Sequence, residues 1–326
     1  MSPEKFKLNY LHPKYWLTWL AVGVTWLLAM MPRSWQRGVA HWVANKLGST
    51  DNRRISTIRR NIDLCFAEES DEYRQRLVQD NRRSSGLMLF DLLNMVWRQS
   101  DDMTSTARVI GAEHLERAVA ADKPLLLVTG HFTPLFQVSS KLASIIPYSA
   151  VYRRLNNPVM EANLYQRGVE KYPISLFHRK DIRRMLEKLA DNGTVFISPD
   201  QDFGVSRGAF VSFFGIPTAT ITSIPQYARQ TNAQVMLFSA YREGNNGSVI
   251  EFEPVLENYP TEDDVADTQR WSDWLEEKIR LCIQQITSGC ISALKHALKE
   301  SLIFIKNIRL NLRSTEDSIW NNLNAR

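Results

Sequence analysis

Short apolar runs alternate with helical stretches between residues 121 and 254, and this alternation constrains the fold more than any other feature of the chain. The apolar runs are PLLLVTG (124–130), YSAVYRR (148–154), TVFISPD (194–200), AQVMLFSAY (233–241) and VIEFEP (249–254). Between them, QVSSKLASII, DIRRMLEKLA and TSIPQYARQT have helical spacing. Buried strands that alternate with helices predict an α/β domain with a central, mostly parallel sheet flanked by helices.

Composition narrows the class of protein without choosing a ligand. The chain has 326 residues, 44% hydrophobic and 23% charged, which argues against a disordered, collagen-like or multi-span membrane protein. Its net charge of +5 favours an anionic partner, such as phospholipid, nucleic acid or an acidic carrier. Three cysteines with no CxxC pair suit a reducing compartment, so we expect the catalytic part to be cytosolic.

An uncharged apolar segment, YWLTWLAVGVTWLLAMM, covers residues 15–31 between Lys14 and Arg33. Its 17 residues just reach the length that a helix needs to span a hydrocarbon core, and its Trp and Tyr residues suit a membrane interface. We therefore predict an N-terminal hydrophobic membrane helix within residues 1–34, followed by the main domain at 35–285. The alternative is a buried core helix.

A basic amphipathic stretch, DNRRISTIRRNIDLCF, follows at residues 51–66. Its apolar residues share one helical face and its arginines lie on the other. One interpretation is a helix that lies on an anionic bilayer surface; the other is a folded helix with a solvated charged face. The apolar residues are Ile55, Ile58, Ile62 and Phe66.

Three of the predicted strands end in polar residues, at the sheet edge where open α/β proteins bind ligands. His131 directly follows the first run, where it is well placed to act as a general base. Arg153 and Arg154 end the second run. The planar guanidinium group of arginine can form paired hydrogen bonds to phosphate or carboxylate. Asp200 and Asp202 end the third run, where they could bind a divalent ion, orient a base or cap a turn.

Each of these residues also has a structural interpretation, such as a surface salt bridge for the arginines and for Arg167 in the next helical stretch. The sequence contains no P-loop, GxGxxG, GxSxG or zinc spacing, which leaves nucleotide-driven and serine-hydrolase chemistry without support. No recognition helix or RNP-like motif accompanies the basic residues, so nucleic-acid binding is also unsupported.

Taken together, seven sequence blocks resemble the late acyltransferases of lipid A biosynthesis, the lauroyl/myristoyl family. The blocks are YLHPKYW near the start, RRNIDLCFAEES (59–70), VIGAEHLERA (109–118), TGHFTPL (129–135), VYRRLNNP (151–158), SPDQDFG (198–204) and FVSFFGIPTAT (210–220). The resemblance implies a glycerolipid-acyltransferase-like fold and transfer of a fatty acyl chain from acyl carrier protein to a hydroxyl of a Kdo-bearing lipid A precursor. It also implies a place on the cytoplasmic side of the inner membrane, with no metal, nucleotide or other cofactor.

The family pattern places an acid five residues after the catalytic histidine, in an HX4D/E motif in which the acid orients the imidazole. His131 matches the first position, but the second is Phe136, which cannot accept a hydrogen bond. Asp200 and Asp202 are therefore the candidates for a substitute carboxylate. The resemblance also assigns Arg167, with the tandem arginines of VYRR, to substrate phosphate or the thioester oxygen.

The same resemblance implies that Phe210, Phe213 and Phe214, in the run FVSFFGIP, line an acyl channel whose depth sets chain length. Core packing is the alternative for these aromatic residues. Two other functions stay open, the first of them because of Phe136 and the atypical tail, residues 286–326. One is a catalytically impaired paralogue that binds lipid or acyl carrier protein, and the other is an acyltransferase with a different lipid acceptor.

The resemblance stops at residue 285, where the family continues with a motif of the type WLHKRFKTRPEGEPDFY. The segment found instead begins ITSGCISALKHALKESLIFIK. If codons that encode this segment are chosen freely and translated in a reading frame shifted by one base, they can encode YLWMHKRFKTRPEGESNFYK. We therefore predict that the atypical tail, residues 286–326, results from a frameshift, and resequencing the gene tests this; a truly divergent tail is the alternative.

Overall fold

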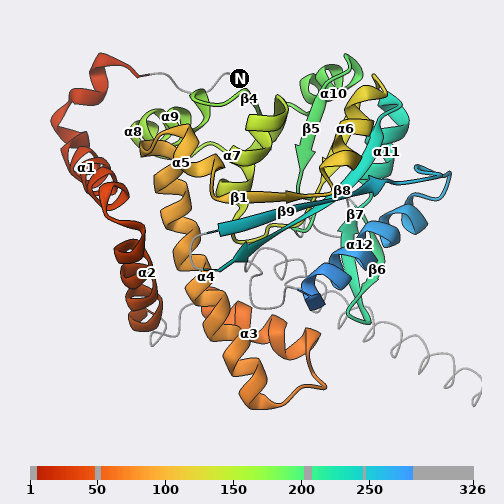
Figure 1. Ribbon diagram of the computed structural model, residues 1–326, viewed down its shortest axis with the longest axis horizontal. Coiled ribbons are helices and arrows are strands. Elements are labelled where there is room, and N and C mark those ends of the chain that lie inside the picture. Colours follow the sequence, from red (N-terminus) through yellow and green to blue (C-terminus); the bar gives the residue numbers. More distant parts are fainter. Residues whose placement is uncertain (1–5, 48–52, 202–207, 245–246, 282–326) are drawn as a thin grey trace, which may run out of the picture.

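The computed structural model describes residues 6–47, 53–201, 208–244 and 247–281 (Figure 1). Within these ranges the core is a seven-stranded sheet in the order β1-β9-β8-β2-β5-β3-β4. Neighbouring strands pair in parallel except β8 and β9, which are antiparallel. The prediction of an α/β domain with a mostly parallel sheet is therefore confirmed. The strands are β1 (Ala107–Ile110), β2 (Leu125–Val128), β3 (Tyr148–Tyr152), β4 (Ile174–His178), β5 (Thr194–Ile197), β8 (Gln234–Glu243) and β9 (Gly247–Val255).

Helices cover both faces of the sheet because its central strands are apolar on both sides. All four residues of β2, LLLV, are buried. The connection from β2 to β3 crosses the sheet in one direction, and the connection from β4 to β5 crosses it in the opposite direction. Right-handed crossovers consequently place α7 (Leu135–Ile145) and α10 (Ile182–Ala190) on opposite faces. The other helices that flank the sheet are α4 (Asp71–Trp97), α5 (Ser100–Thr104), α6 (Ala112–Ala120), α8 (Pro158–Met160), α9 (Gln166–Glu170), α11 (Ser223–Thr231) and α12 (Asp264–Leu281).

A separate antiparallel hairpin joins β5 to α11 and contains the run FVSFFGIP. Its strands, β6 (Gly208–Phe213) and β7 (Ile216–Ile221), pair Phe213 with Ile216 across a two-residue turn. Both turn residues have positive φ, 53° at Phe214 and 69° at Gly215, as tight hairpins require. The hairpin contacts α12. The apolar run FVSFFGIP therefore belongs to a hairpin, which was not predicted from the sequence.

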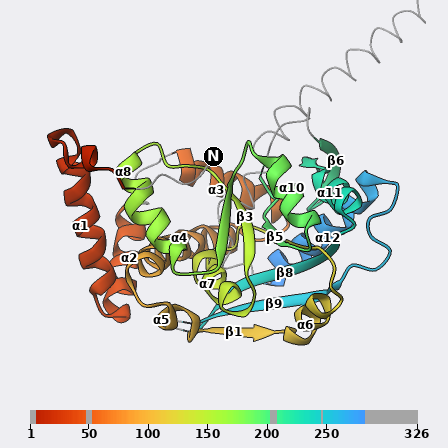
Figure 2. The ribbon, with the colours of Figure 1, turned by 90° about the horizontal axis from the view of Figure 1, so that it is seen from above.

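The apolar N-terminal segment forms α1 (Trp16–Met30), which is followed by α2 (Arg33–Leu47). Both helices lie at one outer edge of the molecule, with α4 between them and the sheet (Figures 1 and 2). The prediction of a membrane-spanning helix is not met, because no helix in the described ranges is long and apolar enough to cross a bilayer. A helix of fifteen residues is about 22 Å long, whereas a hydrocarbon core is about 30 Å thick. The helix ends at Met30 because Met31, which precedes Pro32, has an extended backbone.

The basic amphipathic stretch forms α3 (Arg53–Cys65), and its predicted apolar face is confirmed. Ile58, Ile62 and Phe66 are all buried in the main core, where Phe66 packs edge-on against Phe214. This apolar face is covered by protein, so of the two interpretations the structure favours a folded helix with its charged face toward solvent. Arg59 and Arg60 are exposed on that charged face.

Candidate active site

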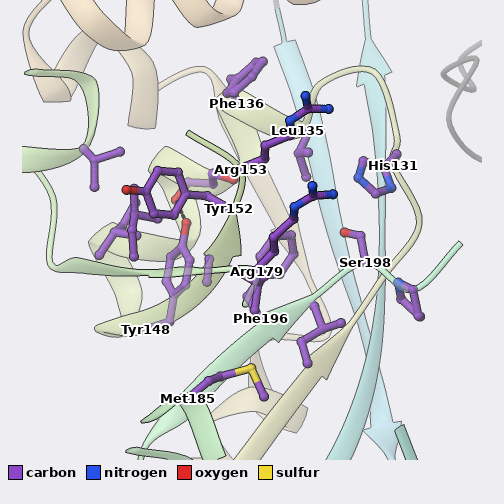
Figure 3. Close-up of a pocket in the computed structure, with 18 of the residues that line it drawn as sticks. His131, Leu135, Phe136, Tyr148, Tyr152, Arg153, Arg179, Met185, Phe196 and Ser198 are labelled. Atoms are coloured by element: carbon purple, nitrogen blue, oxygen red, sulfur yellow. Dashed lines mark hydrogen bonds between the residues drawn. The ribbon is translucent and has the colours of Figure 1, made fainter. Parts of the chain in front are cut away.

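A cavity of about 680 Å³ extends along β3 and β4, from their first residues, Tyr148 and Ile174, to the carboxyl edge of the sheet. Its volume is within the size range of small-molecule sites. Most of its lining side chains are apolar. Figure 3 shows His131, Arg153, Arg179 and Ser198 toward one end of this cavity and Met185 toward the other. An apolar cavity with polar side chains at one end suits a ligand that has a hydrocarbon chain and a polar reactive group. The apolar wall includes Leu135, Phe136, Val151, Ile174, Leu176, Met185 and Phe196.

His131 and Asp200 are brought together by the parallel pairing of β2 with β5. Val128 pairs with Ile197, and His131 and Asp200 each lie three residues beyond this pair. The imidazole Nδ1 lies 2.5 Å from Asp200 Oδ1, and the His131 main-chain N–H donates to Asp200 Oδ2 at 2.9 Å. One buried carboxylate therefore fixes both the ring and the main chain that carries it. Because Nδ1 donates its proton to Asp200, Nε2 is left as the acceptor.

The environment of His131 favours the protonated imidazole. Burial of the ring lowers its pKa, but the negative charge of Asp200 and the hydrogen bond to it outweigh burial, so the pKa is raised above its ordinary value. In the neutral ring Nε2 is an acceptor, and the side-chain amide of Gln201, 3.1 Å away, can donate to it. The pair thus has the tautomer and the basicity that a general base requires.

Phe136 lies on α7, is partly buried and lines the cavity. The side chain contributes to the apolar wall, and the carboxylate that the HX4D/E pattern places at this position comes instead from Asp200, 69 residues after His131. Of the two substitute acids considered from the sequence, Asp200 is the one that the structure places beside the imidazole. Asp202 lies outside the described residues.

The arginines expected at the site are not all brought to it. Arg153 lines the cavity, whereas Arg154, the next residue, does not. Arg167 lies on α9 with its guanidinium 5.7 Å from the centre of the Trp97 ring, and it does not line the cavity either. The side chains of successive residues near a strand end point in opposite directions, which separates Arg153 from Arg154.

The three phenylalanines expected along the acyl channel lie in the β6–β7 hairpin, away from the cavity lining. Phe213 and Phe214 are buried in the core and pack against each other with ring centres 5.0 Å apart. Phe210 is 37% exposed. The positions of Phe213 and Phe214 favour the core-packing alternative, whereas Phe210 neither lines the cavity nor packs in the core. The side chains that line the cavity come from α4, α7, α9, α10, α11, the strands β3 and β4, the carboxyl end of β5 and the last residue of β7.

Sequence reasoning missed Arg179 and Gln201, which also line the cavity. Arg179 follows β4, a strand whose residues are mostly half-buried and whose pattern, ISLFH, is too short and too polar to be recognised. Gln201 follows Asp200 directly, within the motif SPDQDFG. The usable signal for both was the same as for His131, namely a polar residue just past the end of a strand.

Comparison with known proteins identifies relatives along nearly the whole main domain. Residues 3–287 match the model of a family described as bacterial lipid A biosynthesis acyltransferase. The chain is 32% identical to the lipid A biosynthesis lauroyltransferase of Escherichia coli K12 over 282 residues, which cover 84% of this chain and 90% of that protein. It is 30% identical to the palmitoleoyltransferase of the same organism over 274 residues, 82% of this chain and 88% of that protein. The corresponding myristoyltransferase is 22% identical over 280 residues, 84% of this chain and 85% of that protein.

Proposed function

Because the chain belongs to the bacterial lipid A biosynthesis acyltransferase family, we propose that it transfers a fatty acyl chain from acyl carrier protein to a hydroxyl group of a Kdo-bearing lipid A precursor. The observation that carries this proposal is the His131–Asp200 pair at the polar end of an apolar cavity. The pair supplies a base for an alcohol, and the cavity supplies room for a hydrocarbon chain.

Proton transfer begins when the acceptor hydroxyl takes the place of the Gln201 amide at Nε2 of His131. Nε2 removes the hydroxyl proton as the oxygen attacks the thioester carbonyl, and the charge of Asp200 stabilises the imidazolium that forms. The tetrahedral intermediate then breaks its carbon–sulfur bond. The departing thiolate takes the proton from Nε2, so an ester and a free thiol are formed and His131 returns to its neutral state.

The acyl chain occupies the apolar part of the cavity during this reaction. Burial of each methylene stabilises the bound chain by about 0.8 kcal/mol, which holds the thioester carbonyl near His131 at the polar end. Arg153 lines the cavity at this end, where it adds positive charge beside the reacting groups. Binding and chemistry therefore use opposite ends of one cavity.

A direct assay tests the proposal. Purified full-length protein is incubated with radiolabelled acyl-acyl carrier protein and a Kdo-bearing lipid A precursor, and product is followed by thin-layer chromatography and mass spectrometry. We expect the precursor to gain one acyl chain. Transfer to an ornithine lipid or a glycerophospholipid alone would identify a different acceptor. Binding of acyl carrier protein without any transfer would identify a non-catalytic paralogue.

The rate of transfer is expected to fall as the pH is lowered through the pKa of His131, because the protonated imidazole cannot act as a base. Asp200 raises this pKa, so the loss of activity begins at a higher pH than for an ordinary histidine. In Asp200→Asn the titration of the His131 ring should move to lower pH, which NMR of ¹⁵N-labelled histidine can measure without activity.

Asp191→Asn is the matched control for this titration. Asp191 lies just before β5, at the opposite end of that strand from Asp200, and its side chain is 83% exposed. An equal shift in both variants, or none in Asp200→Asn, would show that Asp200 does not set the basicity of His131.

Met185, at the end of the cavity away from His131, is expected to limit the length of the acyl chain. Met185→Ala should shift the preference toward longer chains, because added methylenes fill the vacated space at about 0.8 kcal/mol each, or roughly fourfold in kcat/KM. Competition between acyl donors of different length, read by mass spectrometry, measures the shift. Leu189→Ala is the control, because Leu189 is equally buried on α10 but does not line the cavity. The same shift in both variants would contradict this role.

The N-terminal helices attach the protein to the inner membrane, with the active site on the cytoplasmic side. This part of the proposal is supported by a row of large apolar side chains on α1 that remain exposed, including Leu17 at 79% and Leu20 at 66%. Exposed apolar groups flanked by Lys14 and Arg37 suit the interface of an anionic bilayer. Other exposed apolar residues on α1 and α2 are Trp16, Val24, Trp26, Leu27, Met30, Trp35 and Trp42.

Leu17→Lys/Leu20→Lys is expected to release the protein from vesicles that contain anionic phospholipid, because two charges would enter the apolar layer. Flotation of the protein with vesicles measures this. Val119→Lys is the control, because Val119 is a similarly exposed apolar residue, 48% accessible, on α6. Unchanged flotation of the double variant would contradict attachment through α1.

A further inference from the structure

Arg153 and Arg179 occupy neighbouring positions at the carboxyl edge of the sheet. They follow Tyr152 and His178, which pair in parallel register on β3 and β4. The main-chain N–H of Arg179 also donates to the Tyr152 carbonyl at 3.0 Å, so the pairing continues to Arg179. Adjacent strands lie about 4.8 Å apart, which places the two side chains next to each other. Both line the cavity, and Figure 3 shows their guanidinium groups directed toward the end that holds His131.

The part of the chain that the structure describes offers neither of these two positive charges an ion-pair partner. Among the described residues neither side chain forms a salt bridge, whereas Arg242 lies 2.6 Å from Asp91 and Arg108 lies 2.6 Å from Glu243. Like charges side by side on neighbouring strands are destabilising. The arrangement becomes favourable when a ligand brings an anion between the two guanidinium groups.

We infer that Arg153 and Arg179 form a subsite for a phosphate group of the substrate. Guanidinium groups bind phosphate oxygens through paired hydrogen bonds, and two of them can hold one phosphate from two sides. The inference rests on the proposed function, because that reaction supplies two phosphates. One is the phosphodiester of the phosphopantetheine arm that carries the acyl thioester, and the other is a phosphate on the lipid A precursor.

Arg179 therefore joins Arg153, which the family resemblance had already assigned to substrate phosphate or the thioester oxygen together with Arg154 and Arg167. The new binding residue is Arg179. An anion held here would lie beside the cavity end where His131 acts. The subsite would thus fix the polar part of the substrate while the acyl chain fills the apolar part. Phosphate binding at one end and chain burial at the other would set the position of the thioester between them.

The test compares Arg153→Gln/Arg179→Gln with wild type on substrates that differ only in phosphate. The donor is offered as acyl-phosphopantetheine or as an acyl thioester of N-acetylcysteamine, which has no phosphate. The acceptor is offered with both of its phosphates or with one removed. Arg183→Gln is the matched control, because Arg183 is 87% exposed on α10 and does not line the cavity.

We expect the double variant to lose about 10- to 100-fold in kcat/KM on the phosphate-bearing form of one substrate. The loss should shrink below about threefold on the form of that substrate without the phosphate. Dependence on the donor phosphate identifies the phosphopantetheine arm, and dependence on the acceptor phosphate identifies the lipid. An equal loss on every substrate, or no loss, would overturn the inference.

Equilibrium binding separates this inference from the proposed function. Acyl-phosphopantetheine and the bisphosphorylated acceptor are titrated into His131→Ala protein, which binds substrates without consuming them, with and without the two arginine changes. A Kd that rises about 10-fold or more for one ligand supports the subsite even if wild type transfers no acyl chain. An unchanged Kd for both ligands refutes the subsite even if wild type is active.

Discussion

His131→Ala is expected to lower kcat for acyl transfer by about 10²- to 10⁴-fold, because the acceptor hydroxyl loses its base. Asp200→Asn should cost a comparable factor. An asparagine amide would donate to Nδ1 and leave the proton on Nε2, the wrong tautomer for a base. Acyl transfer under saturating donor, together with a circular dichroism spectrum that shows an unchanged fold, measures both effects. The two losses should not multiply in the double variant, because both residues act through one imidazole.

Phe136→Glu provides the decisive comparison for this first prediction. If Asp200 is the working acid, a glutamate at position 136 places a charge in the apolar wall of the cavity and should not raise kcat. A gain of about tenfold or more in Phe136→Glu would mean that the wild type lacks a functional acid. That result would favour the impaired paralogue over the enzyme.

Asp91→Ala is expected to lower the free energy of unfolding by about 3 kcal/mol, because the guanidinium of Arg242, whose side chain is only 15% exposed, loses its carboxylate partner. Asp91 on α4 is 8% exposed, and its carboxylate lies 2.6 Å from Arg242 at the end of β8. Urea denaturation measures the change. A loss of this size corresponds to a melting temperature lower by roughly 6–12 °C for a domain of this class.

The same ion pair also supports the loop that carries the histidine. Arg242 donates to the main-chain carbonyl of Thr133 at 3.4 Å, and Ser84 donates to the Thr133 hydroxyl at 2.6 Å. Glu243→Ala is the control, because Glu243 forms an ion pair of equal length with Arg108 but on the surface, where the melting temperature should hardly change. Equal melting temperatures for the two variants would show that the buried pair does not hold α4 to the sheet.

The parts of the fold that could be predicted from the sequence are the strand β2, which is apolar on both faces, and the helices that have one clear apolar face. The residues of β2 and the helical spacing of α7, α10 and α11 leave one interpretation, and all four elements are found where they were expected. The strands β1 and β4 escaped prediction because they lie at the two edges of the sheet, where half-buried residues weaken the apolar pattern.

The candidate site could be predicted only in part, because its residues meet through strand pairing. The sequence indicated His131 and offered two carboxylates, but the choice of Asp200 depends on the pairing of β2 with β5. Arg179 depends on the pairing of β3 with β4 in the same way. The aromatic run at residues 210–217 left two interpretations open, because composition does not distinguish a hairpin packed on a helix from the wall of a channel.

The supply of the acid from the end of β5 has a consequence for position 136. In an HX4D/E arrangement, the first turns of one helix must serve proton transfer and also border the space for the lipid tail. Here proton transfer and cavity lining involve different segments, because Asp200 binds His131 and Phe136 lines the cavity. Changes of side-chain size at position 136 can therefore remodel the tail's compartment while the proton relay stays intact, a freedom that an acidic residue at that site would not have.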